Sequence, residues 1–134
     1  MNSTFKAACI QTNSGADVQA NLDSAKDLAR KARDAGADLI ALPETVNIMA
    51  ANRVTLKSKT EPEENNAALR AFQDMAHETG AWVLVGSLLI DVPDSDKMAN
   101  RSFLLDDKGA IRARYDKIHM FDVELGGAEN HMES

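Results

Sequence analysis

The sequence lacks the features that would place it outside the cell, in a membrane or on a nucleic acid. Cys9 is its one cysteine, so no disulfide forms within the chain, which fits a reducing cytoplasm. No apolar run reaches the roughly 20 residues that span a bilayer, and residues 1–6 lack the apolar stretch of a signal peptide. Acidic residues outnumber basic ones by 21 to 15, which argues against binding of phosphate backbones. We expect a cytoplasmic protein with no nucleic-acid or membrane partner.

A metal or cofactor site is also missing from the pattern. The nearest approach to a ligand cluster is His119, Asp122, Glu124 and His131, whose spacing matches no tight ligand arrangement. In an extended segment, His119 would share a face with Lys117 rather than point at the other three. We therefore expect neither a metal nor a cofactor.

What the sequence does contain is the pattern of one α/β domain. Its 134 residues, of which 44% are hydrophobic, suit a single folded core. Apolar segments alternate with segments of helical period in the order β-α-β-α-β-β-β. The predicted strands are 5–11, 37–42, 81–90, 98–106 and 110–116, and the predicted helices are 18–35, capped by Asp17, and 62–79.

This order predicts a mixed sheet. Crossover helices make the first three strands parallel, and the turn at 106–109 makes the last two an antiparallel hairpin. Residues 45–61 are expected to form a long loop with at most a helical turn. Two helices cover one face of such a sheet, while strands such as 39–42 are apolar on both sides, so the second face needs another sheet or a partner.

Four single residues carry further expectations. Cys9 lies in an apolar strand, which predicts an inert, buried thiol. Trp82 begins a strand and is expected in the core, whereas His77 lies near a helix end and is expected at the surface. Gly86 interrupts a strand, which indicates a bulge or a close backbone approach.

Glu44 is the residue on which a functional interpretation begins. Pro43 ends the strand before it, because proline has no N–H to give to a sheet. Ligands in open α/β sheets bind outside the carboxyl ends of strands, where Glu44 stands. Taken alone, Glu44 is better interpreted as a solvated loop carboxylate, and Lys117 as an ordinary surface lysine.

Five blocks of sequence occur in a single order along nearly the whole chain. They are Cys9-Ile-Gln11, Ala37-Asp-Leu-Ile-Ala-Leu-Pro-Glu44, Val83-Leu-Val-Gly-Ser87, Asn100-Arg-Ser-Phe-Leu-Leu105 with Gly109, and Tyr115-Asp-Lys-Ile-His-Met-Phe-Asp122. Together they resemble the nitrilase superfamily, the carbon–nitrogen hydrolases. The first and last blocks are most similar to the bacterial branch near the omega-amidases.

The resemblance implies a four-layer α-β-β-α sandwich and a Glu-Lys-Cys triad. On matching positions, Glu44 would be the general base and Lys117 the catalytic lysine. Glu133 resembles the second active-site glutamate of the family. The nucleophilic cysteine would lie tens of residues beyond Lys117. Residues 1–134 are therefore expected to be the N-terminal portion of a single carbon–nitrogen hydrolase domain, truncated before the nucleophile and inactive alone.

Three functions follow in order of preference. The first is a cofactor-free hydrolase fragment whose complete enzyme cleaves small non-peptide amides or nitriles. The second is a non-catalytic half-domain that self-associates or pairs with a complementary chain, as a homo-oligomer or an aggregation-prone fragment; the missing nucleophile and the uncovered sheet face favour it. The third is a receiver-type signalling module, which ranks last because Gln11-Thr12 stands where that module needs acidic residues.

Overall fold

The structure, a computed structural model, describes residues 4–119, 122–124 and 130–132. Its helices are α1 (Val18–Asp34), α2 (Arg53–Lys59) and α3 (Ala67–Thr79), with a 3₁₀ turn η1 (Glu63–Asn65). Its strands are β1 (Ala7–Cys9), β2 (Leu39–Ala41), β3 (Trp82–Asp91), β4 (Met98–Leu105), β5 (Ile111–Asp116), β6 (Asp122–Glu124) and β7 (Asn130–Met132).

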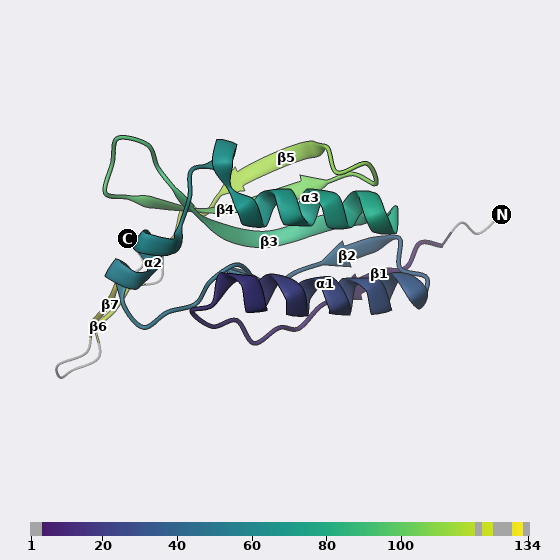
Figure 1. The fold of residues 1–134 in the computed structure, drawn as a ribbon, viewed down its shortest axis with the longest axis horizontal. Coiled ribbons are helices and arrows are strands. Elements are labelled where there is room, and N and C mark those ends of the chain that lie inside the picture. Colours follow the sequence, from purple (N-terminus) through teal and green to yellow (C-terminus); the bar gives the residue numbers. More distant parts are fainter. Residues whose placement is uncertain (1–3, 120–121, 125–129, 133–134) are drawn as a thin grey trace.

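The first five strands form one mixed sheet in the order β1-β2-β3-β4-β5 (Figure 1). β1, β2 and β3 are parallel, with Ile40 paired to Ala8 on one side and to Val83 on the other. β3, β4 and β5 are antiparallel. The predicted α/β class and mixed sheet are confirmed. β6 and β7 form a separate antiparallel pair.

The core lies between this sheet and the helices α1 and α3, which run side by side on one face of it (Figure 1). α1 begins where the Asp17 side chain accepts a hydrogen bond from the N–H of Ala20, as its sequence predicted. The apolar stripes of both helices are buried against the strand side chains that point toward the helices. The buried set includes Leu22, Ala25, Ala29, Leu69, Phe72, Met75, Ala76, Ile40, Val83, Val85, Phe103 and Leu105.

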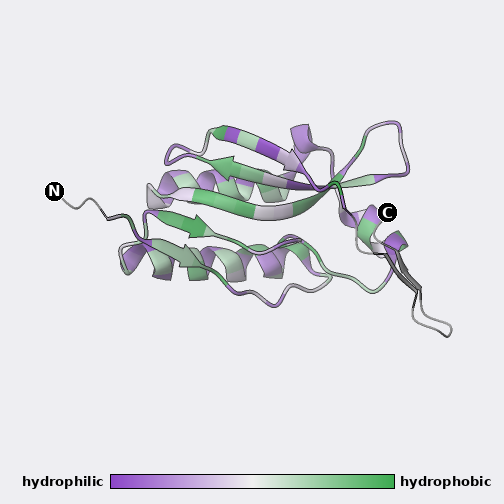
Figure 2. Cartoon of the chain, turned by 180° about the vertical axis from the view of Figure 1, so that it is seen from behind, coloured by the Kyte–Doolittle hydropathy of each residue, from purple (hydrophilic) through white to green (hydrophobic). Residues whose placement is uncertain are grey.

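The other face of the sheet, whose strands are coloured by hydropathy in Figure 2, has apolar side chains that are exposed. Trp82 is 41% exposed and Leu84 is 38% exposed, and the register sets them beside Leu39 and Ala41 of β2. The expectations of a buried Trp82 and a buried Cys9 were therefore wrong. Both side chains fall, by strand alternation, on the face opposite to α1 and α3, and Cys9 is exposed there. The four-layer sandwich itself stays a prediction.

The boundaries of the second predicted helix were also wrong at its start. Pro62 precedes the 3₁₀ turn η1, and α3 begins only at Ala67. The reason is Asn66, whose side-chain oxygen accepts a hydrogen bond from the N–H of Leu69 at 2.9 Å and so caps the helix there. Gly80 ends α3 in the left-handed conformation, as predicted.

The segment 45–61 is more ordered than the loop that its sequence predicted. It contains α2, which Asn52 caps by accepting a hydrogen bond from the N–H of Thr55 at 2.8 Å. None of the helices in the described part of the chain has both the length and the apolar character to cross a bilayer.

Candidate active site

Glu44 and Lys117 form an ion pair at one edge of the sheet. The Nζ atom of Lys117 lies 2.8 Å from Oε1 of Glu44. The lysine side chain is 32% exposed and the glutamate side chain 56% exposed, so the pair is open to solvent on one side. The prediction that these two residues lie within a few ångströms of each other is confirmed.

The way they meet differs from the expectation of adjacent strands. Glu44 follows β2 and Lys117 follows β5, and β3 and β4 lie between these strands in the sheet. Lys117 instead continues the pairing of β5 with β4 by one residue, because its N–H donates to the carbonyl oxygen of Asn100 at 2.9 Å. The long lysine side chain then spans the remaining distance to Glu44.

A bulge in β3 brings the Glu44 turn inward. Gly86 and Ser87 interrupt the pairing between β3 and β4, which shifts in register between Val85 and Leu88. A Cβ atom on Gly86 would lie 2.3 Å from the carbonyl oxygen of Leu42, so only glycine allows β3 to approach the exit of β2 this closely. The predicted bulge or close approach at Gly86 is confirmed, in both senses.

Ser87 then fastens the turn that carries Glu44. Its hydroxyl oxygen accepts a hydrogen bond from the N–H of Thr45 at 2.8 Å. Its carbonyl oxygen accepts from the N–H of Val46 at 3.1 Å, and its own N–H donates to the carbonyl oxygen of Pro43 at 3.3 Å. Thr45 has a φ of 46°, a left-handed conformation that costs a β-branched residue energy. Strained backbone beside a carboxylate is typical of functional sites.

Buried asparagines hold the next part of the same loop. The side chain of Asn47 pairs with the backbone of Leu89 in β3, accepting from its N–H at 3.1 Å and donating to its carbonyl at 3.2 Å. Asn21 of α1 donates to the carbonyl of Asn47 at 3.0 Å. The loop after Glu44 is thus tied both to the sheet and to a helix.

Asn100 is the site residue that sequence reasoning missed. Its side chain is buried, and its Nδ2 donates to Oε1 of Glu44 at 2.9 Å, the same oxygen that Lys117 contacts. The one available signal was that Asn100 begins one of the five sequence blocks that carry the family resemblance. Nothing in a single asparagine distinguishes such a role from that of an ordinary strand residue.

Charges next to Lys117 belong to a separate ion-pair network. Arg101 contacts Asp116 at 2.5 Å and Glu63 at 2.6 Å, and Arg114 contacts Glu63 at 2.7 Å. The hydrogen bond from Arg101 lowers the pKa of Asp116. Burial raises the pKa of Glu63, but the hydrogen bonds from Arg114 and Arg101 outweigh it and the net shift is downward.

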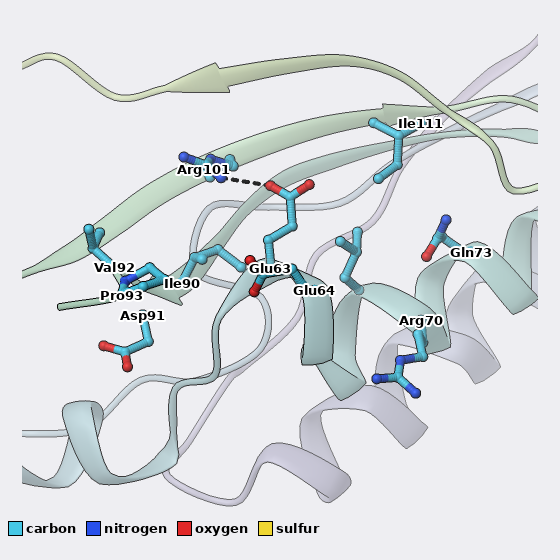
Figure 3. Close-up of a pocket in the computed structure, with 11 residues that line it drawn as sticks. Glu63, Glu64, Arg70, Gln73, Ile90, Asp91, Val92, Pro93, Arg101 and Ile111 are labelled. Atoms are coloured by element: carbon cyan, nitrogen blue, oxygen red, sulfur yellow. Dashed lines mark hydrogen bonds and ion pairs between the residues drawn. The ribbon is translucent and has the colours of Figure 1, made fainter.

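A groove of about 440 Å³ lies beside this network on the helix side of the sheet (Figure 3). Its lining includes Glu63, Arg101 and Asp91, and neither Glu44 nor Lys117 belongs to it. In Figure 3, Arg101 and Glu63 point at each other. Asp91 forms an ion pair with Lys57, which does not line the groove. Because these charges already have partners, the groove is the weaker candidate for catalysis.

The remaining predicted site residues are distributed as follows. Glu133 lies outside the described residues. His77 and His119 are exposed, as was expected for His77. Within residues 4–119, no three potential ligand side chains come together to hold a metal ion.

Comparison with known proteins identifies the family. A sequence profile for carbon–nitrogen hydrolases matches residues 6–134. The chain belongs to the carbon–nitrogen hydrolase family. It is similar to the deaminated glutathione amidase of Yersinia enterocolitica, with 31% identity over 119 residues, which cover 88% of this chain and 41% of that enzyme. The resemblance to the nitrilase superfamily is thereby confirmed.

Solved structures agree with this assignment. The crystal structure of the Caenorhabditis elegans NitFhit protein superimposes with a TM-score of 0.82 at 25% identity, covering 96% of this chain and 31% of that one. Yeast Nit3, a member of branch 10 of the nitrilase superfamily, superimposes with a TM-score of 0.76 at 22% identity, covering 87% of this chain and 45% of that one. The chain therefore spans less than half the length of these relatives.

Proposed function

We propose that this chain is the N-terminal portion of an amidase of the carbon–nitrogen hydrolase family, and that Glu44 and Lys117 are two members of its Glu-Lys-Cys triad. The observation that carries the proposal is the 2.8 Å contact between Lys117 Nζ and Glu44 Oε1 at the carboxyl edge of the sheet. The names of curated relatives favour an amide over a nitrile as the substrate. The cytoplasmic location remains part of the proposal.

The chemistry of amide hydrolysis suits this pair. A thiol nucleophile needs a base, because free cysteine is mostly protonated at neutral pH. Glu44 would accept that proton, deliver it to the departing ammonia and later activate water. Lys117 would hold the carboxylate in place and stabilise the oxyanion of the tetrahedral intermediate.

The nucleophile and the second glutamate complete the proposal. Cys9 stands in a short edge strand, paired to Ala41, and not on the strand-to-helix turn that the family resemblance implies for the nucleophile. We assign the nucleophilic cysteine to a segment outside these 134 residues. Glu133 would be the second active-site glutamate, and this assignment rests on the sequence resemblance alone.

A chimera tests the proposal. The chain would replace the corresponding segment of the Yersinia enterocolitica deaminated glutathione amidase, which it matches over 119 residues, so that the relative supplies the remainder of the domain. The chimera should hydrolyse a small amide such as deaminated glutathione. Glu44→Gln and Lys117→Met should each lower kcat by about 1,000-fold or more, since removing one member of a covalent-catalysis unit removes most of the rate.

Lys108→Met is the matched control, because Lys108 lies in the turn between β4 and β5 and contacts neither Glu44 nor Lys117 through any bond described above. It should leave kcat within about twofold, as is usual for exposed substitutions away from a site. A folded, active chimera whose rate survives Glu44→Gln would contradict the assignment of the base.

A second function is favoured by the exposed sheet face with Trp82 and Leu84. In this alternative the chain is a non-catalytic half-domain that associates with itself or with a complementary chain. Apolar patches of a few hundred Å² on a soluble protein mark interaction surfaces. Sedimentation of the chain, argued in the Discussion, tests this association directly.

A further inference from the structure

We propose that Asn100 is a positioning residue that fixes which carboxylate oxygen of Glu44 transfers protons. The inference rests on the proposed function of Glu44 as the base and deepens it. Two donors, Asn100 Nδ2 at 2.9 Å and Lys117 Nζ at 2.8 Å, converge on the single oxygen Oε1. Among the residues that the structure describes, no hydrogen bond reaches Oε2. Oε2 is thereby the oxygen presented for proton transfer.

The placement of Asn100 explains how one residue holds both members of the pair. Its side chain donates to Glu44, while its carbonyl oxygen accepts the N–H of Lys117 at 2.9 Å. Its own backbone is fixed, because it pairs with Leu89 in the antiparallel ladder between β3 and β4. The distance between base and cation is thus set by a strand and not by a loop, and sites built on strands are held more precisely.

Burial shields this contact from water more than the contact from the lysine. Asn100 is 2% exposed, whereas the Lys117 side chain is 32% exposed. Water competes little for a donor that is buried, and a hydrogen bond to a charged acceptor is stronger than one between neutral groups. A lysine ammonium acts as a point charge, so the Glu44 carboxylate could still rotate while it kept that contact. The hydrogen bond from the Asn100 amide adds a second fixed direction and so restricts this rotation.

Ser102 provides a matched comparison within the same strand. It lies two residues after Asn100, so its side chain points to the same side of the sheet. Its hydroxyl donates to the carbonyl oxygen of Gly86 at 2.6 Å and not to Glu44. Substitutions at Asn100 and Ser102 therefore both remove a hydrogen bond from β4, but only the first touches the carboxylate.

The first measurement needs no catalysis. In the 134-residue chain labelled with ¹⁵N-asparagine, the side-chain amide signal of Asn100 is identified by its loss in Asn100→Leu. Glu44→Ala should move that signal and speed the exchange of its protons with solvent by about tenfold or more, because the acceptor is gone. Ser102→Ala should leave it in place. An Asn100 amide signal unaffected by Glu44→Ala would overturn the inference.

The second measurement uses the chimera. Asn100→Leu, which keeps the size but loses the donor, should lower kcat by about 10- to 100-fold with KM changed less than about threefold, because misplacing the base affects the transition state. Asn100→Asp should be worse, since it sets a second carboxylate against Glu44. Rates are counted per folded molecule, from the near-ultraviolet circular dichroism of each variant, so that a merely structural role would leave kcat unchanged.

The two measurements separate this inference from the proposed function. An active chimera whose kcat per folded molecule survives both Asn100 variants refutes the positioning role and leaves the function intact. A chimera that is inactive with its native residues, while Glu44→Ala still moves the Asn100 signal, refutes the function and supports the contact. Because Glu44 is largely exposed, Glu44→Ala does not threaten the fold, and where Asn100→Leu fails to fold, the Asn100 signal is identified instead by triple-resonance assignment of the native chain.

Discussion

The hydroxyl oxygen of Ser87 accepts a hydrogen bond from the N–H of Thr45 at 2.8 Å, and Thr45 is held there with a φ of 46°. The turn that presents Glu44 is therefore strained and is held by a residue of another strand. Ser87→Ala should lower the free energy of unfolding by about 1 kcal/mol, because the buried acceptor is lost. Thr45→Gly should instead be neutral or stabilising, since glycine adopts positive φ without strain. Urea unfolding of both variants checks this, and equal losses in the two would contradict it.

Among the glycines that the structure describes outside turns, Gly86 is predicted to be the least replaceable. In Gly86→Ala the new Cβ would meet the Leu42 carbonyl oxygen at 2.3 Å, so β3 and the exit of β2 would have to separate. We expect a loss of about 2 kcal/mol or more in the free energy of unfolding. Gly15 is the matched control, because nothing lies within 4 Å of its Cβ position. Gly15→Ala should change stability by less than about 1 kcal/mol, and a similar loss in both variants would refute the close approach.

Acid should weaken the fold through the arginine network. The pKa values of Asp116 and Glu63 are both lowered in the folded chain, so the unfolded chain binds protons more readily. Their contribution is therefore present at neutral pH and is lost as the pH falls from about 5 towards 3. Arg101→Met should reduce this loss by about 1 kcal/mol or less, because the Asp116 side chain is 53% exposed and solvent screens the pair.

Urea unfolding at neutral and acidic pH measures the effect of Arg101→Met. Arg30 supplies the control, since its contacts to Asp27 and Glu78 are exposed and longer, at 3.4 Å each. Arg30→Met should show the same pH dependence as the native sequence. A pH dependence that Arg101→Met leaves unchanged would show that the network does not govern acid stability.

The sequence correctly predicted the residues that form the hydrophobic core between the sheet and the helices. Period-two and helical patterns located residues such as Ile40, Phe72 and Val83 correctly, because burial of apolar area decides their positions. Trp82 and Cys9 were misplaced for a physical reason: the pattern reports that a face is apolar, and not whether anything covers it. Only the three-dimensional structure shows whether an apolar face of the sheet is covered.

The candidate site was predictable in its charged residues and not in its support. Glu44 and Lys117 stand out as charged groups at strand ends, and the family resemblance joined them. The contact across two intervening strands depends on a bulge at Gly86 and on the position of Asn100, which are tertiary features. A polar residue inside a strand has no periodicity of its own, so its partner cannot be read from the sequence.

The 134-residue chain alone is expected to have no amidase activity. Cys9, its one thiol, lies in the edge strand β1 and is assigned no catalytic part. Incubation of the purified chain with small amides should release ammonia no faster than a Cys9→Ser variant or buffer. Turnover by the native chain that Cys9→Ser abolishes would overturn both this prediction and the assignment of the nucleophile to another segment.

The exposed sheet face should drive the isolated chain to associate. Trp82 and Leu84 of β3 stand opposite Leu39 and Ala41 of β2, on the face that α1 and α3 do not cover. Figure 2 shows the sheet from this side. Each 100 Å² of apolar surface left in water forgoes about 2.5 kcal/mol, a large share of the roughly 5–15 kcal/mol that holds a domain together. Dimers, larger assemblies or capture of a complementary fragment would each bury this surface.

Sedimentation of the chain over a range of concentrations measures this association, together with a dye that fluoresces on exposed apolar surface. Leu84→Lys should shift the chain towards monomer, because it sets a charge in the middle of the face. Val54→Lys is the control, since Val54 is 80% exposed but lies on α2 and not on the sheet. A monomer that binds no dye at high concentration would mean that the face is already covered, and the half-domain alternative would then be wrong.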